Sequence, residues 1–194
     1  MPQLSALQWL ELVAVAFAVL YLLLAIRQNI WCWAAAAVST GLYLYIMYAA
    51  QLYMESALQV FYLAMAAYGW YQWRLGGAEH EGVDVTTWRW RNHVVSITVV
   101  LVLVFTSGYL LERYSDAALP FADAFTTWSA VIATWMVARK ILENWIYWFV
   151  IDAVSVYLYL SRELYFTAVL FVAYLVMIVF GYRSWRRSML EQAA

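Results

Sequence analysis

The feature that most constrains this chain is a succession of seven long apolar runs with mostly short polar segments between them. A helix needs about 17 to 25 mainly apolar residues to cross the hydrocarbon core of a bilayer. The chain is 67% hydrophobic and 12% charged, whereas soluble domains are about half apolar and about a quarter charged. We therefore predict an all-α integral membrane protein. Its seven transmembrane helices are expected at residues 6–26, 30–50, 56–74, 94–111, 118–138, 144–161 and 165–183.

One connection is much longer than the others and divides the chain. It is RLGGAEHEGVDVTTWRWRNH, residues 74–93, and its Gly-rich, charged composition is typical of a solvated loop. His80 and His93 lie in it without the Cys or carboxylate spacing of a metal site, so we expect both to be solvated. The predicted organisation is a first three-helix repeat (1–74), a cytoplasmic loop with a linker helix (75–117), a second three-helix repeat (118–187) and a cytoplasmic tail (188–194).

Basic residues are distributed unevenly between the two sides of this plan. If the N-terminus is outside, two basic residues face outward, Arg113 and Arg162. Nine face inward: Arg27, Arg74, Arg89, Arg91, Arg139, Lys140, Arg183, Arg186 and Arg187. Cytoplasmic loops carry the excess of Lys and Arg, so the predicted N-terminus is periplasmic and the C-terminus cytoplasmic. The net charge of −1 argues against nucleic acid as a partner.

The two halves contain similar sequences, which predicts an internal repeat. LYLY at 42–45 matches VYLY at 156–159, and Trp31 falls on Trp145 at the same offset of 114 residues; GWYQWR at 69–74 matches GYRSWR at 181–186 at an offset of 112. Two copies of a three-helix unit joined by one linker helix insert in the same direction. This 3+1+3 arrangement is the parallel-repeat plan of SWEET-type sugar carriers, in which substrate sits near the midplane between the repeats.

The run ENWIYWFVIDAVSVYLYL, residues 143–160, contains one carboxylate, Asp152, at its centre. A carboxylate is costly in hydrocarbon, so it should face protein, water or a ligand. At the offset of 114 its counterpart is Val38, so the repeated fold does not require the acid. Both a structural hydrogen bond and a ligand contact remain open. Helical spacing places five side chains on one stripe: Trp145, Trp148, Asp152, Ser155 and Tyr159.

Three segments together resemble the Pnu family of bacterial vitamin transporters. They are GWYQWR after the third run, VARKILENWIYWFVIDAVSVYLYL at 137–160 and RELYFTAVLFVAYLVMIVFGYRSWRR at 162–187, and the resemblance extends over all seven runs. It is strongest toward members that carry nicotinamide riboside, while relatives carry thiamine or riboflavin. The resemblance implies an inner-membrane carrier with the 3+1+3 plan that works by facilitated diffusion, with phosphorylation retaining the vitamin inside the cell. The family's Trp-x-x-Trp elements are matched by Trp70 with Trp73 and Trp145 with Trp148.

Nicotinamide riboside and thiamine both carry a positive charge on an aromatic ring, which suits aromatic faces together with a carboxylate. Beyond the stripe on the sixth run, candidate substrate-binding residues lie on the third and fifth runs: Gln59, Tyr62, Trp70, Trp73, Asp123 and Thr127. For Trp73 and Trp145, anchoring at the membrane interface is an alternative. For the threonine, close packing between membrane helices is an alternative.

Other classes of function have weaker support in the sequence. No Ser-His-Asp set, phosphate-binding glycine loop or metal-ligand spacing is present, so we expect no catalytic residues, metal or cofactor. Asp152 and Asp123 could form a proton relay in a proton-coupled carrier or an intramembrane enzyme. A non-transporting scaffold is a third possibility. The expected partners are a small vitamin and the lipid bilayer, with a homo-oligomer left open.

Overall fold

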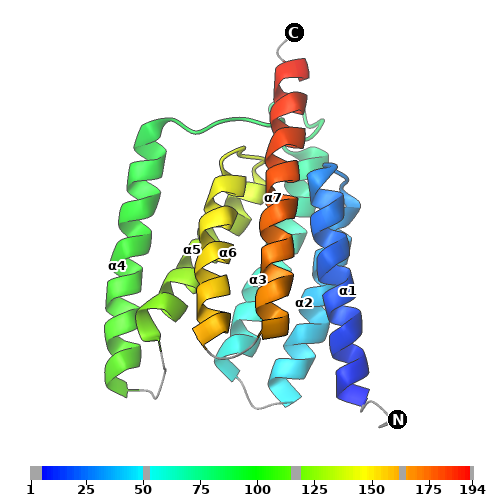
Figure 1. Cartoon of the computed structure of the whole chain (residues 1–194). Helices are drawn as coiled ribbons and strands as arrows, with labels where there is room; N and C mark the ends of the chain where they lie inside the picture. Colours follow the sequence, from blue (N-terminus) through cyan, green and yellow to red (C-terminus); the bar gives the residue numbers. More distant parts are fainter. Residues whose placement is uncertain (1–5, 50–52, 115–118, 162–164, 193–194) are drawn as a thin grey trace. The chain divides into compact units, whose positions relative to one another are not determined.

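The computed structural model describes residues 6–49, 53–114, 119–161 and 165–192, and this part of the chain is built from α-helices (Figure 1). They are α1 (Ala6–Ile26), α2 (Trp31–Ala49), α3 (Tyr53–Leu75), α4 (Trp90–Tyr114), α5 (Pro120–Ala138), α6 (Asn144–Ser161) and α7 (Tyr165–Gln192). The seven predicted helices are confirmed. Several bounds differ from the predicted ones by one to three residues, and the two largest differences are that α4 begins four residues earlier and that α7 continues through most of the expected tail.

The chain divides into two compact units, residues 1–84 and 85–194, so that α4 belongs with the second three helices. Four described stretches are long and apolar enough to cross a membrane by length and composition: Leu7–Ile26, Trp31–Ala49, Trp90–Tyr114 and Ala168–Gln192. The other helices, α3, α5 and α6, have 23, 19 and 18 residues, and each contains a charged residue: Arg74 in α3, Asp123 in α5 and Asp152 in α6. Their length still fits the hydrocarbon core.

In the first unit, α2 packs between α1 and α3. Small buried residues, among them Ala14 and Cys32, let the helix backbones approach closely. The hydroxyl of Ser39 donates a hydrogen bond of 2.9 Å to the carbonyl oxygen of Ala14, which joins α2 to α1. On the other side of α2 the indole of Trp33 lies against Gly69 and meets Trp73 edge-on, with ring centroids 5.5 Å apart.

In the second unit the helices contact one another in chain order, α4 with α5, α5 with α6 and α6 with α7. Val100, Val104 and Gly108 recur every four residues on α4 and form its buried stripe. Phe121 of α5 covers Gly108, and the indole Nε1 of Trp128 donates a 3.0 Å hydrogen bond to the hydroxyl of Ser107. These contacts hold α4, which is the predicted linker helix, against α5 of the second repeat.

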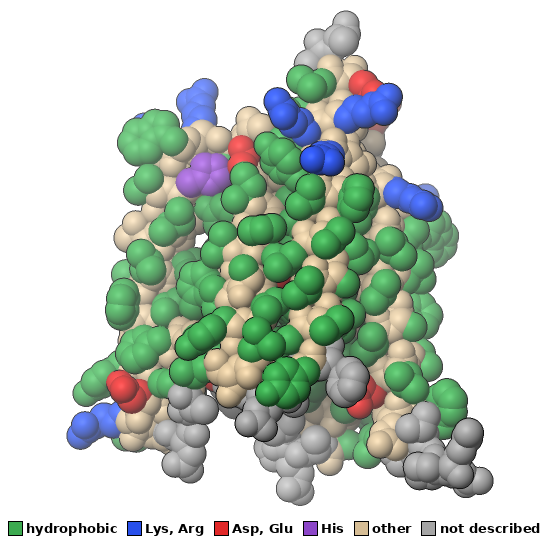
Figure 2. Space-filling model, in the orientation of Figure 1, with side chains coloured by type: hydrophobic (Ala, Val, Ile, Leu, Met, Phe, Trp, Pro, Cys, Tyr) green, Lys and Arg blue, Asp and Glu red, His purple; other side chains and the backbone are tan. Residues whose placement is uncertain are grey.

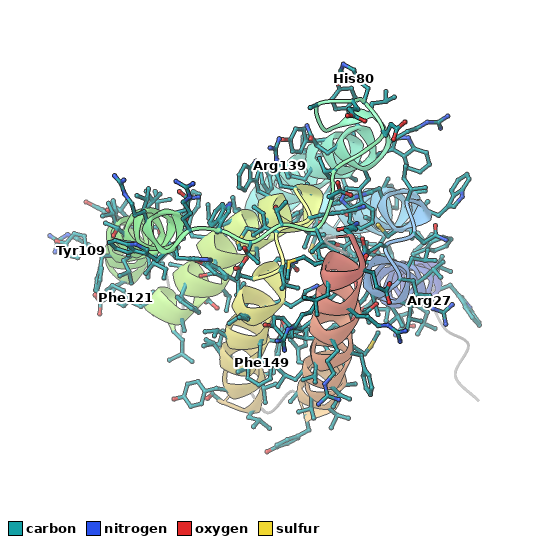
Figure 3. All side chains as sticks on the ribbon, turned by 90° about the horizontal axis from the view of Figure 1, so that it is seen from above. Arg27, His80, Tyr109, Phe121, Arg139 and Phe149 are labelled. Atoms are coloured by element: carbon teal, nitrogen blue, oxygen red, sulfur yellow. The ribbon has the colours of Figure 1, made fainter. Side chains whose placement is uncertain are left out.

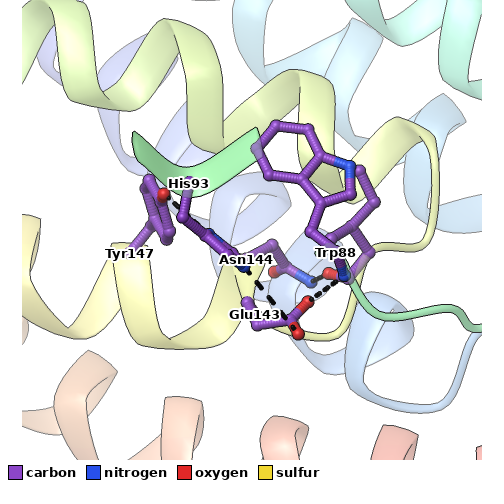
Figure 4. Close-up of polar contacts among 6 residues, drawn as sticks. Trp88, His93, Glu143, Asn144 and Tyr147 are labelled. Atoms are coloured by element: carbon purple, nitrogen blue, oxygen red, sulfur yellow. Dashed lines mark hydrogen bonds and ion pairs between the residues drawn. The ribbon is translucent and has the colours of Figure 1, made fainter. Parts of the chain in front are cut away.

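The segment that precedes α4 is fastened to the turn between α5 and α6. The backbone N–H of Thr86 donates to the carbonyl of Lys140 at 3.1 Å, and the N–H of Leu142 donates to the carbonyl of Thr86 at 2.8 Å. The N–H of Trp88 also donates to the carboxylate of Glu143 at 3.2 Å (Figure 4). The polar connection is therefore anchored to the second unit at its C-terminal end.

The prediction that His93 lies in a solvated loop is wrong. His93 is in the first turn of α4, where its Nδ1 lies 3.0 Å from the hydroxyl of Tyr147 and its Nε2 lies 4.0 Å from the carboxylate of Glu143 (Figure 4). Its ring also packs edge-on against Trp88. The helix begins earlier than hydropathy indicates because these contacts satisfy the polar side chains of its first turn. His80, in contrast, is exposed as expected.

The repeat is visible in matching turns. The turn after α1 has Gln28 at φ 53°, and the turn after α5 has Lys140 at φ 47°. In both, the next N–H donates five residues back at 2.9 Å, from Asn29 to Leu24 and from Ile141 to Met136. These are Schellman caps with a left-handed residue that is not glycine. The two turns correspond residue for residue at an offset of 112.

The tryptophan contacts confirm this offset through both helix pairs. Trp145 lies against Gly181 and meets Trp185 edge-on at 5.4 Å, as Trp33 does with Gly69 and Trp73. The counterpart of Trp145 is therefore Trp33, and the alignment with Trp31 at an offset of 114 is wrong. A shift of two residues turns a helical side chain by about 200°, to the opposite face. The counterpart of Asp152 accordingly becomes Thr40 instead of Val38.

Candidate substrate-binding face of α6

The polar and aromatic stripe predicted on α6 forms the buried face of that helix. Trp145, Asp152 and Ser155 are buried, while Trp148 and Tyr159 are half-buried. The opposite face carries the exposed apolar side chains Ile146, Phe149, Val150, Tyr157 and Leu160. The helical period therefore separates an exposed apolar face from a buried face that carries the polar groups.

Asp152 is the central polar group of this face. Its side chain is 6% exposed and lies about two turns from either end of α6. No hydrogen bond or ion pair joins its carboxylate to another residue within the described ranges. One turn later, the hydroxyl of Ser155 donates to the carbonyl oxygen of Ile151 at 2.9 Å, which leaves its oxygen lone pairs able to accept.

The start of α6 holds two buried polar atoms that have no partner among the described residues. The Nε1 of Trp145 is one and the Oδ1 of Asn144 is the other, although the amide nitrogen of Asn144 donates to the carbonyl of Ile141 at 2.6 Å. Buried polar atoms are normally satisfied, so each exception calls for an explanation. Asn144 was not among the residues predicted from the sequence. At the offset of 112, Asn144 corresponds to Cys32 of the first repeat. The sequence signal for Asn144 was therefore an amide at a position where the other repeat has a thiol.

Trp145 has a packing role that the sequence did not reveal. Its ring is 2% exposed and is held between Gly181 and Trp185 of α7. Trp148, one turn further along, is half-buried and keeps part of its surface accessible. Tyr159 lies near the other end of the helix and contacts Phe171 with ring centroids 4.9 Å apart. The five predicted side chains therefore share one face but differ in exposure, since Trp148 and Tyr159 are half-buried and the other three are buried.

The candidates on α3 belong to the first unit. Gln59 and Tyr62 are half-buried on one side of the helix. Trp70 is also half-buried and meets Trp31 edge-on at 5.4 Å, whereas Trp73 is 7% exposed beneath Trp33. Of the two tryptophans in this Trp-x-x-Trp element, Trp73 is a packing residue and Trp70 keeps an accessible ring.

The two α5 candidates, Asp123 and Thr127, are half-buried. Asp123 lies in the first turn of α5, close to Pro120, while Asp152 lies in the middle of α6. A helix rises about 1.5 Å per residue, so the two carboxylates are at different depths. This geometry gives little support to a proton relay that would join them directly.

Among the cavities in the described part of the second unit, two lie beside α6. One, of about 320 Å³, is a mainly apolar space between α4, α5 and α6. The other, of about 390 Å³, lies between α6 and α7. Neither is lined by Asp152, so neither is the ligand site that the polar stripe predicts.

The comparisons with known proteins agree with this architecture. Residues 8–187 match the family model described as nicotinamide mononucleotide transporter. The chain belongs to this family. It is similar in fold to the crystal structure of the vitamin B3 transporter PnuC, with a TM-score of 0.74 and 23% identity over 94% of this chain and 83% of the other. The protein is therefore a helical membrane protein of a transporter family.

Curated proteins that are similar to this chain are named for different substrates. The riboflavin/roseoflavin transporter RibM of Streptomyces davaonensis is 27% identical, over 91% of this chain and 84% of its own. The nicotinamide riboside transporter PnuC of Escherichia coli is 25% identical, over 97% of this chain and 89% of its own. Both are transporters of vitamins or related compounds. Membership of this family therefore identifies the class of function, a transporter, but not the substrate. The substrate has to be inferred from the chemistry of the site.

Proposed function

We propose that the protein carries nicotinamide riboside across the bacterial inner membrane by facilitated diffusion with alternating access. The observation that carries this proposal is the buried carboxylate of Asp152, which has no partner among the described residues and lies on an aromatic face of α6. A buried charge is stabilised only when it is paired. A cationic pyridinium ring supplies that pair, and the neighbouring aromatic ring stabilises it further through cation–π attraction.

The other polar groups on this face suit the ribose. Trp148 has an accessible ring that can stack on the vitamin, one turn from Asp152. The Oδ1 of Asn144, the Nε1 of Trp145 and the hydroxyl oxygen of Ser155 can accept from or donate to sugar hydroxyls. The α3 candidates Gln59, Tyr62 and Trp70 lie in the first unit and stay separate predictions from the sequence.

Riboflavin and thiamine are the alternative cargoes. The relative RibM is named as a riboflavin transporter, and its 27% identity makes riboflavin a serious competitor. The isoalloxazine ring of riboflavin is neutral, however, and gives no counter-charge to Asp152. Thiamine is cationic and aromatic, so it satisfies the same requirement and ranks second.

The experiment that tests the proposal is uptake of labelled nicotinamide riboside into liposomes containing the purified protein. We expect saturable uptake that an excess of unlabelled nicotinamide riboside abolishes, that riboflavin leaves largely intact, and that does not depend on a pH gradient. Dependence on the gradient would indicate a proton-coupled carrier instead. Uptake of riboflavin but not of nicotinamide riboside would refute the assignment of cargo, and absence of all flux would favour a scaffold.

The proposed orientation places the N-terminus in the periplasm and the C-terminus in the cytoplasm. It is supported by the nine-to-two distribution of basic residues, of which Arg162 lies outside the described residues. In a Cys32→Ala background, Glu79→Cys should react with a membrane-impermeant maleimide only after the cells are opened. Arg113→Cys, at the opposite end of α4, is the matched control and should react in intact cells. The reverse pattern would contradict this orientation.

A further inference from the structure

The cavity between α6 and α7 has an apolar floor and a basic end. Its volume is about 390 Å³. Phe149, labelled in Figure 3, lies beside α7 and is 45% exposed, and Val179 on α7 is 40% exposed. The apolar floor is formed by Ile146, Phe149, Ile178 and Val179 and the basic end by Arg183 and Arg186, and the aromatic side chains of Trp145 and Tyr182 complete the lining. The floor lies about one helical turn from the first arginine.

The two arginines at this end are available to a ligand. Neither Arg183 nor Arg186 forms an ion pair with another residue in the described part of the chain, and both are exposed. The adjacent Arg187 differs, because its Nε contacts the carboxylate of Glu191 at 2.9 Å. Figure 2 shows blue side chains gathered at the C-terminal end of α7, next to the green apolar surface of the helix. The groove therefore joins an unpaired positive charge to a surface suited to hydrocarbon.

We propose that this groove binds one anionic phospholipid, with its phosphate on Arg183 and Arg186 and an acyl chain along Phe149 and Val179. Guanidinium groups bind phosphate oxygens through paired N–H donors. Basic pockets between membrane helices are recognised sites for anionic headgroups. Because α6 also carries Asp152 on its buried face, the lipid would contact the exposed side of the helix to which we assign the vitamin.

Charge and shape together distinguish this occupant from others. A free phosphate ion would use the arginines but not the apolar floor. A zwitterionic lipid would use the floor, but its choline group would offset the attraction of its phosphate. A second copy of this chain would have to place a carboxylate against the arginines and an apolar side chain in the groove. An anionic lipid supplies both features in one molecule and is always present in the surrounding membrane.

Native mass spectrometry of the detergent-purified protein tests the proposal, since it resolves bound lipid and oligomeric mass together. The protein is titrated with phosphatidylglycerol, phosphatidylcholine or inorganic phosphate. The test variant is Arg183→Gln with Arg186→Gln, and Arg187→Gln is the matched control. Each basic side chain near an anionic headgroup contributes about 5-fold, so the double variant should retain phosphatidylglycerol about 25-fold less tightly than the wild type. The control should retain it nearly unchanged.

Three outcomes would overturn the proposal. They are equal retention of phosphatidylcholine, undiminished phosphatidylglycerol binding by the double variant, and an inorganic phosphate adduct at the same concentration. Val179→Phe provides a second test that keeps both charges and fills the groove, and it should also reduce lipid retention. If Val179→Phe instead lowers the oligomeric mass without affecting lipid, the groove is an interface between copies, which likewise contradicts a lipid site. None of these readouts depends on transport of a vitamin.

Discussion

Asp152→Asn should weaken the binding of nicotinamide riboside about 10- to 100-fold while the protein remains folded. Asparagine has nearly the shape of aspartate and keeps most of its hydrogen-bonding capacity but removes the charge. A hydrogen bond to a charged group contributes about 1.5–3 kcal/mol, and every 1.4 kcal/mol corresponds to about tenfold in affinity. The measurement is a binding titration of the purified variant, with thermal unfolding recorded on the same sample.

The matched control is Asp84→Asn, which removes a carboxylate outside the helices and should leave affinity unchanged. Trp148→Ala should also weaken binding, because it removes a stacking face one turn from Asp152. If Asp152 is instead a structural group, the Asn variant will bind as tightly as the wild type and any defect will appear in its thermal stability. That result would remove Asp152 from the site and leave recognition to the aromatic side chains.

Gly181→Ala should lower the stability of the protein substantially. A Cβ atom at this position would lie 2.5 Å from the ring of Trp145, which is 2% exposed and cannot move aside freely. Adding a methyl group to a tightly packed core typically costs about 1–3 kcal/mol. Gly69→Ala should have a comparable effect in the first repeat, where its Cβ would collide with Trp33. Thermal unfolding in detergent measures both.

The chain offers its own control in Gly41, which lies within α2 at a place where an added methyl group would have no neighbouring atom within 4 Å. Gly41→Ala should be neutral or stabilising, by about 0.5–1 kcal/mol, because alanine loses less backbone entropy than glycine in a helix. Trp145→Phe removes one ring from the contact and should partly restore the stability of Gly181→Ala in the double variant. A Gly181→Ala variant as stable as the wild type would show that this helix contact is looser than the structure indicates.

Helix positions and the polar face of α6 could both be predicted from the sequence, for the same physical reason. A bilayer requires long apolar helices, so hydropathy alone located all seven, and the bounds of α1 and α6 agree with the predicted ones. The helical period then determines which side chains share a face, so Trp145, Asp152 and Ser155 were grouped correctly. Neither inference needs knowledge of a neighbouring helix.

The contacts between helices, in contrast, could be determined only from the tertiary structure. The repeated letters LYLY and VYLY suggested an offset of 114, but the left-handed residues Gln28 and Lys140 set the start of α2 and α6 and require 112. Neither is a glycine, so composition gave no sign of the turn. Likewise, hydropathy placed His93 in solvent, while the structure places it in a helix, where it contacts Tyr147 and Glu143, 54 and 50 residues further along the chain. The sequence pattern of a helix predicts which face each side chain lies on. Which residues that face contacts depends on how the helices pack, and the sequence pattern does not contain this information.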